Sequence, residues 1–482
     1  MPLQNYEDQP TLSQLADECL SRLKSAKGTE RVDLYYYKAN CHRAICSINA
    51  SDSNIAWSWN QPHGIAEVLA LRKAIKEPAF SNISPIRTSQ IRTNLANRLS
   101  NLGRPIAANE QWIKALKSTP KFAKALCNRA QGIMEYSARL YDKNHQSILL
   151  RAALEEFDAS LSEDAIWESS DRDLFVVSLQ TQRLEIEKYL SQVGYRYDYD
   201  LDQFGFGITS DEIQYRSWSI KNCLFLNPLN DVHDVSVAAT DVLHLPSHKI
   251  NETPRFPAYF NLLKQEYVSA RYRLFRALYI NDPDYIMRDV LMFATSEGQV
   301  LGHHTEELRS ALRAAYSIFD KLSLFLNDYF KLGHKPLHVS FTSVWREKAK
   351  NSNSKIHPIF KDRQNLPLRG LYFLSRDLLD SQFKDVAEPD SVDLAKLRHQ
   401  AEHRFLSLQY FGYGDSTETH KLINIEDFGN KTLRMLKLAR EALVYVSLAM
   451  HREEKLRSEL NAENDKISIP IISLPIENFN LR

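Results

Sequence analysis

Four side chains that could act on a phosphodiester lie close together late in the chain, within the segment LAKLRHQAEHRFLSL (394–408). They are Arg398, His399, Glu402 and His403. A guanidinium can hold a phosphate through two parallel hydrogen bonds, and an imidazole titrates near neutral pH. An arginine beside a histidine therefore indicates general acid–base chemistry on a phosphate ester.

The pattern of apolar residues predicts that this segment is one amphipathic helix. These residues recur at steps of three and four: Leu394, Leu397, Ala401, Phe405 and Leu408. On such a helix His399 and His403 share a face, whereas Arg398 and His403 lie roughly 140° apart and can line one cleft. A similar spacing occurs at Arg139 and His145, which straddle an expected helix end. The spacing alone therefore does not identify a site, and the sequence context of each pair must distinguish them.

The overall composition is that of an ordinary globular protein with no dominant charge. The 482 residues include 61 basic and 60 acidic side chains, which leaves a net charge of +1. Any surface that attracts nucleic acid must therefore be local. Only 14 glycines are present, and neither GxGxxG nor GxxxxGK[ST] occurs, so nucleotide binding through those loops is not supported.

Cysteine usage and hydropathy indicate a cytoplasmic protein. The five cysteines are sparse and form no CxxC pair, so we expect reduced thiols: Cys19, Cys41, Cys46, Cys127 and Cys223. The first residues, MPLQNYEDQPTL, lack the apolar core of a signal peptide. Since no apolar run reaches about 18 residues, no membrane span is expected.

Residues 1–193 are expected to form stacked helical hairpins. The clearest unit is LANRLSNLGRPIAANEQWIKALKSTP (95–120), in which Gly103 permits a tight turn and Pro120 ends the second helix. Its two apolar stripes contain Leu95, Ala96, Leu99, Ala108, Trp112 and Ala115. The unit resembles a tetratricopeptide repeat, which implies an α-solenoid. The alternative is an irregular helical array that matches the repeat pattern once.

A second helical region is expected at residues 211–460. A linker or ordered loop rich in Tyr, Asp and Gly (194–210) precedes it, and an apolar tail with two prolines (461–482) follows as an edge strand or docking arm. The loop's aromatic side chains either stack on bases or, as we favour, pack the loop down. Alternation in KPLHVSFTSVW (335–345) predicts a short extended piece. The predicted helices are Tyr259–Leu278, Glu306–Leu332, Leu368–Asp380 and Phe428–Arg457.

This second region resembles the HEPN superfamily (higher eukaryotes and prokaryotes nucleotide-binding). The resemblance rests on three blocks in order, KNCLFLNPLND, LRGLYFLSRDLLD and LRHQAEHRF, the last of which holds an Arg-x4-His motif. It implies an all-α protein whose C-terminal helical bundle is an RNA endonuclease that needs no metal or other cofactor. His403 would act as general acid or base, Arg398 would stabilise charge on the phosphate, His399 would orient the phosphate, and Glu402 would fix an imidazole tautomer.

The same resemblance implies partners and a biological setting. HEPN nucleases generally dimerise, so that two motif helices meet across one cleft around the RNA substrate. Such proteins often belong to toxin–antitoxin or antiphage systems. The repeats in front would then sense a trigger or bind a protein partner or antitoxin along a concave surface.

Three other interpretations of the motif stay open. His399 and His403 form an HxxxH pair that could bind a metal, although one helix supplies only two good ligands. Arg398 and Glu402 could form an ordinary ion pair one helical turn apart. Finally, the bundle could be catalytically idle and serve as a scaffold that binds RNA or protein.

Overall fold

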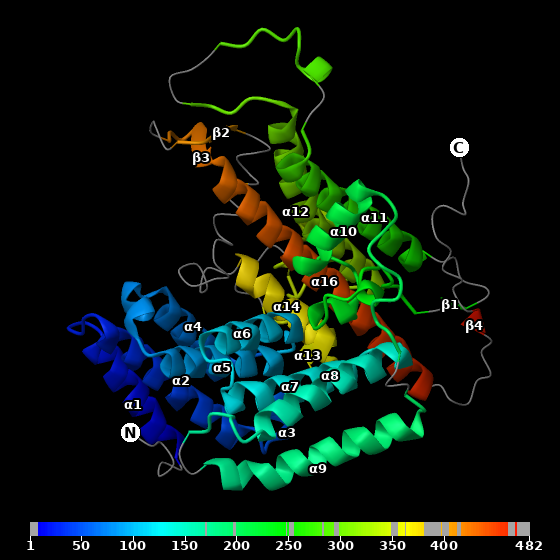
Figure 1. The fold of residues 1–482 in the computed structure, drawn as a ribbon. Helices are drawn as coiled ribbons and strands as arrows, with labels where there is room; N and C mark the ends of the chain where they lie inside the picture. The colour runs from blue at the N-terminus through cyan, green and yellow to red at the C-terminus, as the bar shows by residue number, and fades with distance from the viewer. Residues whose placement is uncertain are drawn as a thin grey trace.

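The protein is all-α in this computed structural model, with paired N-terminal helices packed against a C-terminal bundle (Figure 1). The structure describes residues 8–168, 171–195, 199–246, 248–249, 255–281, 284–293, 298–348, 355–361, 363–379, 397, 404–411, 416–460 and 468–469. The sequence prediction of an all-α fold is thus confirmed.

The N-terminal helices pack against their neighbours in the chain. Contacts join α1 to α2, α2 to α4, α5 to α6 and α7 to α8, so the region is built from antiparallel pairs. The elements are α1 (Gln9–Arg22), α2 (Thr29–Asn49), α3 (Ser53–Trp57), α4 (Pro62–Lys76), the 3₁₀ turn η2 (Pro78–Asn82), α5 (Pro85–Asn101), α6 (Pro105–Ser118), α7 (Ala123–Ser137), α8 (Lys143–Leu161) and α9 (Asp171–Gln192).

The α5–α6 hairpin forms for reasons visible in the sequence. The Ser84 hydroxyl caps α5 by accepting a hydrogen bond from the Arg87 backbone N–H at 3.2 Å. Gly103 takes a φ of +90° in the turn between the helices, a conformation that favours glycine. All six residues of the two predicted apolar stripes are buried. The hairpin is therefore as expected, while its assignment as a tetratricopeptide repeat stays a prediction.

The C-terminal helices surround α16, which runs diagonally through the middle of the molecule in Figure 1. The apolar stripe predicted for the long helix at 306–332 is buried on α12, where it faces α11 and α16. The elements are α10 (Ser210–Lys221), η3 (Pro228–Asp231), η4 (Ser236–Ala238), α11 (Arg255–Tyr279), η5 (Asp284–Ile286), α12 (His303–Tyr329), η6 (Pro336–His338), α13 (Pro358–Lys361), α14 (Leu366–Leu379) and α16 (Ile425–Leu460).

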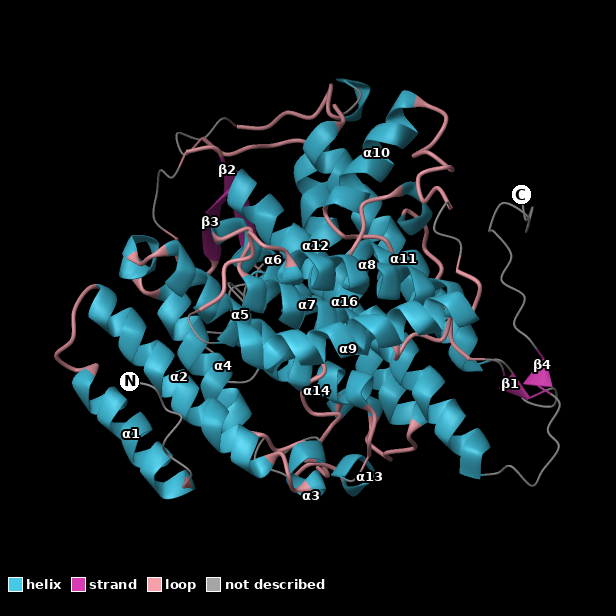
Figure 2. Cartoon of the chain, turned by 60° about the horizontal axis from the view of Figure 1, so that its bottom comes forward, coloured by secondary structure: helices cyan, strands magenta, loops and turns pink. Residues whose placement is uncertain are grey.

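Two short strand pairs lie beside the helices (Figure 2). In the first, β2 (Phe405–Gln409) runs parallel to β3 (His420–Asn424). In the second, β1 (His248–Lys249) pairs antiparallel with β4 (Ser468–Ile469), two residues of the predicted tail.

Two sequence predictions are wrong in this region. The segment 394–408 is not one helix, because its last residues belong to β2. A short apolar run such as FLSLQ fits a helix or a buried strand equally well, and the pairing with β3 decides the matter. The piece at 335–345 is not extended. It forms the turn η6 followed by further turns, which bury Phe341, Val344 and Trp345.

The last N-terminal helices, α7 to α9, share one hydrophobic core with the C-terminal bundle. Buried side chains of α7, α8 and α9 belong to the same cluster as those of α12, α14 and α16. The backbones touch where the α5–α6 turn meets α14, since a Cβ on Gly370 would lie 1.9 Å from the Gly103 carbonyl oxygen. Glycine at both positions therefore allows the array to dock closely.

A buried network of ion pairs crosses the same contact. The Arg104 guanidinium donates to both oxygens of Glu441 at 2.9 and 3.0 Å, and it also pairs with Asp377. Asp377 accepts a second hydrogen bond from Arg72 at 2.8 Å. All four side chains are buried. Because each charge has a partner, the network can hold α4 and the α5–α6 turn in one position against α14 and α16.

The stability of the fold should decrease between pH 7 and pH 5. His451 of α16 stacks on Tyr141, with ring centroids 3.7 Å apart. Burial and the adjacent His244 lower the pKa of His451 to about 3, whereas an unfolded histidine titrates near about 6.5. The unfolded chain therefore takes up the proton first, so the stabilisation is complete above the unfolded pKa and is lost as the pH falls towards the folded one.

Thermal unfolding at the two pH values checks this prediction. The variant His451→Gln keeps a hydrogen-bond donor but has no titrating ring, so it should lose less stability than the wild type. An equal loss in both proteins would contradict the role given to His451.

Candidate functional site

The four predicted site residues lie outside the described residues. Arg398, His399, Glu402 and His403 therefore keep the roles predicted from the sequence, without a geometry. The described residues that flank them in the chain are Leu397 and Arg404. Leu397 is 2% exposed and belongs to the main hydrophobic core.

The strand that follows the motif is fastened to the bundle on both sides. Along one edge it pairs with β3 through its whole length. On the other side, the Val300 backbone N–H donates to the Leu408 carbonyl at 2.7 Å, and the Arg309 guanidinium of α12 donates to the Leu406 carbonyl at 2.6 Å. The chain directly after His403 is thus held by both backbone and side-chain contacts.

A hydrogen-bonded row of polar side chains crosses β2 at Ser407. The Gln299 amide donates to the Ser407 hydroxyl at 2.9 Å, and this hydroxyl lies 2.7 Å from His420 Nε2 on β3. A hydroxyl that already accepts one hydrogen bond can donate its own proton to an imidazole nitrogen. The row holds the His420 ring beside β2, the strand that follows the motif in the chain, and adds an imidazole that the motif itself does not contain. The sequence interpretation did not single it out, and a lone histidine after a loop gives no signal by itself.

Cationic side chains gather at the same end of the bundle. Arg309 and Arg313 of α12 both lie within ion-pair distance of Glu306, and Arg404 donates to the Glu418 backbone carbonyl. Glu307 of α12 pairs with His303 at the same end, so charges of both signs lie there, and a local basic surface for nucleic acid stays a prediction.

The acidic residue of the first block that carried the HEPN resemblance is structural. Asp231, from KNCLFLNPLND, is 7% exposed, pairs with Arg440 of α16 and accepts a hydrogen bond from the Tyr136 hydroxyl at 2.8 Å. Burial alone would lower the pKa of Arg440, but the Asp231 carboxylate raises it above its usual value. A single acidic residue within an apolar block was the available signal for this role.

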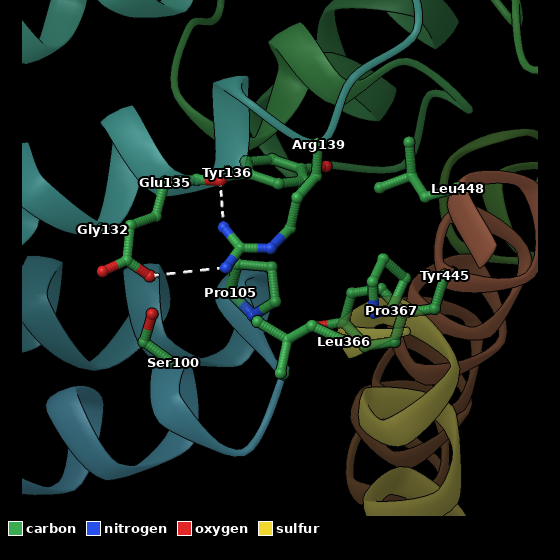
Figure 3. Close-up of a pocket in the computed structure, with 11 residues that line it drawn as sticks. Ser100, Pro105, Gly132, Glu135, Tyr136, Arg139, Leu366, Pro367, Tyr445 and Leu448 are labelled. Atoms are coloured by element: carbon green, nitrogen blue, oxygen red, sulfur yellow. Dashed lines mark hydrogen bonds and ion pairs between the residues drawn. The ribbon is translucent and has the colours of Figure 1, made fainter. Parts of the chain in front are cut away.

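The crevice between the array and the bundle is too small for a substrate (Figure 3). It encloses about 10 Å³ between Gly132 of α7 and Arg139, which follows α7, on one side and Leu366 and Tyr445 on the other. Arg139 bends back to pair with Glu135 across its mouth. A volume of about this size holds at most one water molecule, so the crevice is a packing gap.

Neither a metal cluster nor a membrane helix is found in the part of the chain that the structure describes. Within those residues, no three His, Cys, Asp or Glu side chains converge as metal ligands would. None of the described helices combines the length and hydropathy needed to cross a bilayer. The HxxxH pair of the open metal interpretation lies outside these residues.

Comparison with known proteins identifies the C-terminal region. Residues 247–453 match the family model described as LA2681-like HEPN. No curated protein and no solved structure matches the chain significantly. The matched segment begins before α11, includes the Arg398-x4-His403 motif and ends within α16. The C-terminal region of this chain is therefore similar to the LA2681-like HEPN family, which is consistent with a member of the HEPN superfamily.

Proposed function

We propose that the HEPN domain is a metal-independent RNA endonuclease. The observation that carries the proposal is the family match over residues 247–453, because this segment contains an arginine and a histidine at HEPN motif spacing. The guanidinium groups of Arg309 and Arg404 and the His420 imidazole at the β2 end of the bundle support it, since such groups can contact an RNA backbone.

The proposed reaction is attack of a ribose 2′-OH on the adjacent phosphorus. The new O2′–P bond forms as the bond from phosphorus to the 5′ oxygen breaks, which leaves a 2′,3′-cyclic phosphate and a 5′-OH. His403 takes the proton of the 2′-OH or delivers a proton to the leaving 5′ oxygen, and Arg398 stabilises the growing charge on the phosphate. His399 orients the phosphate, and Glu402 fixes the tautomer of an imidazole.

Cleavage of RNA by the purified chain tests the proposal. Total RNA is incubated with the full-length protein in EDTA, and the ends of the fragments are analysed. Fragments with 2′,3′-cyclic phosphate ends should accumulate, and single-stranded DNA of the same length should stay intact. Loss of cleavage in EDTA would contradict the proposal and favour the His399/His403 metal pair.

The active unit is proposed to be a homodimer formed at the β2 end of the bundle. One motif supplies half of a symmetric site, and a two-fold contact brings two motifs together. The end of the bundle carries exposed aromatic side chains that a monomer would leave in water: Phe405 (76% exposed), Tyr410 (60%) and Phe411 (65%). Exposed apolar groups of this size often mark an interface between subunits.

Light scattering on the full-length chain checks the dimer. The wild type should have about twice the 55.7 kDa mass of one chain. The variant Phe405→Asp should have a mass closer to that of the monomer and should also cleave RNA more slowly. Phe204 is 66% exposed and lies about 200 residues before Phe405 in the sequence. The control variant Phe204→Asp should stay dimeric. A wild-type monomer with full activity would rule out the composite site.

The proposed role of the N-terminal helices is control of the nuclease. The shared core and the buried ion pairs tie them to α14 and α16, so a ligand on these helices can influence the bundle mechanically. A toxin or an antiphage effector is the proposed setting, with the array as the part that senses a trigger or binds a protein partner.

A further inference from the structure

A second and much larger cavity lies within the N-terminal helices. It encloses about 380 Å³ and is lined by α2, α5, α7, the segment that follows α8, and α9. Small-molecule sites in proteins usually measure about 300–1,000 Å³. This cavity is therefore large enough for a ligand the size of a nucleotide, which the crevice beside α14 is not.

Three carboxamide side chains present polar atoms to the cavity. Asn97, Asn128 and Gln131 line it, and a neighbour fixes one polar atom of each. The Asn97 oxygen accepts from a tryptophan indole at 3.0 Å, the Asn128 nitrogen donates to a backbone carbonyl at 2.7 Å, and the Gln131 nitrogen lies 3.5 Å from another carboxamide. Within the described residues, this leaves the Asn97 NH₂ group and the oxygens of Asn128 and Gln131 for a ligand.

Two buried polar atoms of the cavity lining lack a partner. Thr93 is 3% exposed, and its hydroxyl makes no hydrogen bond with any described residue. The indole N–H of Trp167 is likewise buried and unpaired among them. Buried polar groups without partners cost free energy, so two of them around one cavity indicate a site that a ligand completes.

Flat aromatic rings form one wall of the cavity. Trp167 stacks on Phe175, with ring centroids 6.4 Å apart and planes 18° apart. Phe175 is 45% exposed even though it lines the cavity. Tyr36 of α2 also lines the cavity, and the Arg87 guanidinium lies over its ring at 4.5 Å. Such rings offer faces on which a nucleobase can stack.

A guanidinium without a carboxylate partner completes the lining. Arg43 donates to the Asn94 side chain at 3.3 Å and forms no ion pair with any described carboxylate. The one acidic residue of the lining, Glu168, is already engaged by Lys124 and Gln90. Glu67 interacts with the charge of Arg43 at longer range but does not pair with it, so the guanidinium can still attract an anionic group on the ligand.

We infer that this cavity binds a nucleotide, either free or as one unit of a single-stranded RNA. Arg43 holds the phosphate, the Trp167 ring stacks on the base, and the Asn97, Asn128 and Gln131 carboxamides bond to the base edge. A peptide main chain could also bond to carboxamides, but it brings no planar ring to the aromatic wall. The inference does not depend on RNA cleavage, because the site is built from helices outside the HEPN domain.

Binding to the full-length chain tests the inference. One probe is a fluorescein-labelled ten-nucleotide RNA with 2′-O-methyl groups, which lacks the attacking hydroxyl and cannot be cut. It is followed by fluorescence anisotropy, and the four 5′-mononucleotides are titrated by calorimetry. Trp167→Ala should weaken binding at least about fivefold, since stacking contributes about 1–3 kcal/mol per base. Arg43→Gln should also weaken RNA binding and reduce its logarithmic salt dependence by about 0.7.

Two further variants separate a binding role from a structural one. Arg22→Gln removes an exposed arginine of α1 whose ion pair among the described residues is with Glu30, and it should bind as the wild type does. Thr93→Val replaces the unpaired hydroxyl by a methyl group of similar size. It should raise the melting temperature of the free protein and weaken nucleotide binding, a combination that loss of a packing contact would not produce.

The outcomes divide cleanly. Binding of mononucleotides and RNA, or of RNA alone, with the losses expected for Arg43→Gln and Trp167→Ala, supports the inference and identifies the source of the nucleotide. The inference is overturned if neither probe binds, or if both variants bind normally. It is also overturned if a labelled acidic decapeptide binds through Arg43 while nucleotides do not. None of these results depends on whether RNA is cleaved.

Discussion

Replacing His403 by alanine should slow RNA cleavage by about 100- to 10,000-fold, which is the usual contribution of general acid–base catalysis. An imidazole with a pKa near about 6.5 can both accept and donate a proton at neutral pH, and an alanine can do neither. Initial rates on a labelled single-stranded RNA measure the effect. Circular dichroism and light scattering of the variant should match the wild type, because the change removes only a functional group.

Matched variants separate the motif from histidines and charges elsewhere. His338→Ala changes an exposed histidine of the turn η6 and should retain full activity. Arg398→Lys should fail although it keeps the charge, since lysine lacks the planar fork that binds two phosphate oxygens. If His403→Ala cleaves as fast as the wild type, the catalytic assignment is wrong, and a scaffold that binds RNA becomes the better account.

Replacing Asp377 by alanine should lower the free energy of unfolding by about 3–5 kcal/mol. The carboxylate is 3% exposed and pairs with both Arg72 and Arg104. Its loss removes from the interior a carboxylate that two guanidinium groups share. Because these residues join α4 and the α5–α6 turn to α14 and α16, the variant should also loosen the N-terminal helices from the bundle.

Urea unfolding and limited proteolysis measure the two effects. The control is Glu30→Ala, which breaks an exposed pair with Arg22 and should cost less than about 1 kcal/mol. In the wild type, proteases should cut within the segment 194–210 and leave two pieces that stay associated through the shared core. An unchanged unfolding energy for Asp377→Ala would show that the buried network contributes little to docking.

Long, strongly periodic helices were predictable from the sequence. The stripe from Leu308 to Leu326 repeats over several turns, so only a helix can bury it on one side, and α12 does so. The α5–α6 hairpin was equally predictable, because Gly103 marks its turn and Pro120 marks the end of its second helix. The strand β2 was not, since five residues give too short a pattern and its partner lies beyond a loop.

The site was predictable only as a set of residue types. Arg398 and His403 were found from their chemistry and spacing, and the family match covers them. The buried network of ion pairs between the N-terminal helices and the bundle was not predictable. Arg104 and Asp377 are 273 residues apart in the sequence, and neither belongs to a local motif. The N-terminal cavity that Arg43 lines was not predicted for the same reason. Its lining comes from four helices and the segment between two of them, and along each helix these residues resemble the usual polar residues of a protein surface.

Cleavage of an RNA with one modified ribose tests the central claim most directly. A cut site is first mapped in a short labelled RNA, and the same RNA is then made with a 2′-deoxyribose on the 5′ side of that bond. Since the missing hydroxyl is the proposed nucleophile, the full-length protein in EDTA should cut the unmodified RNA and leave the modified bond intact. Equal cleavage of both RNAs would contradict 2′-OH attack at the Arg398/His403 motif.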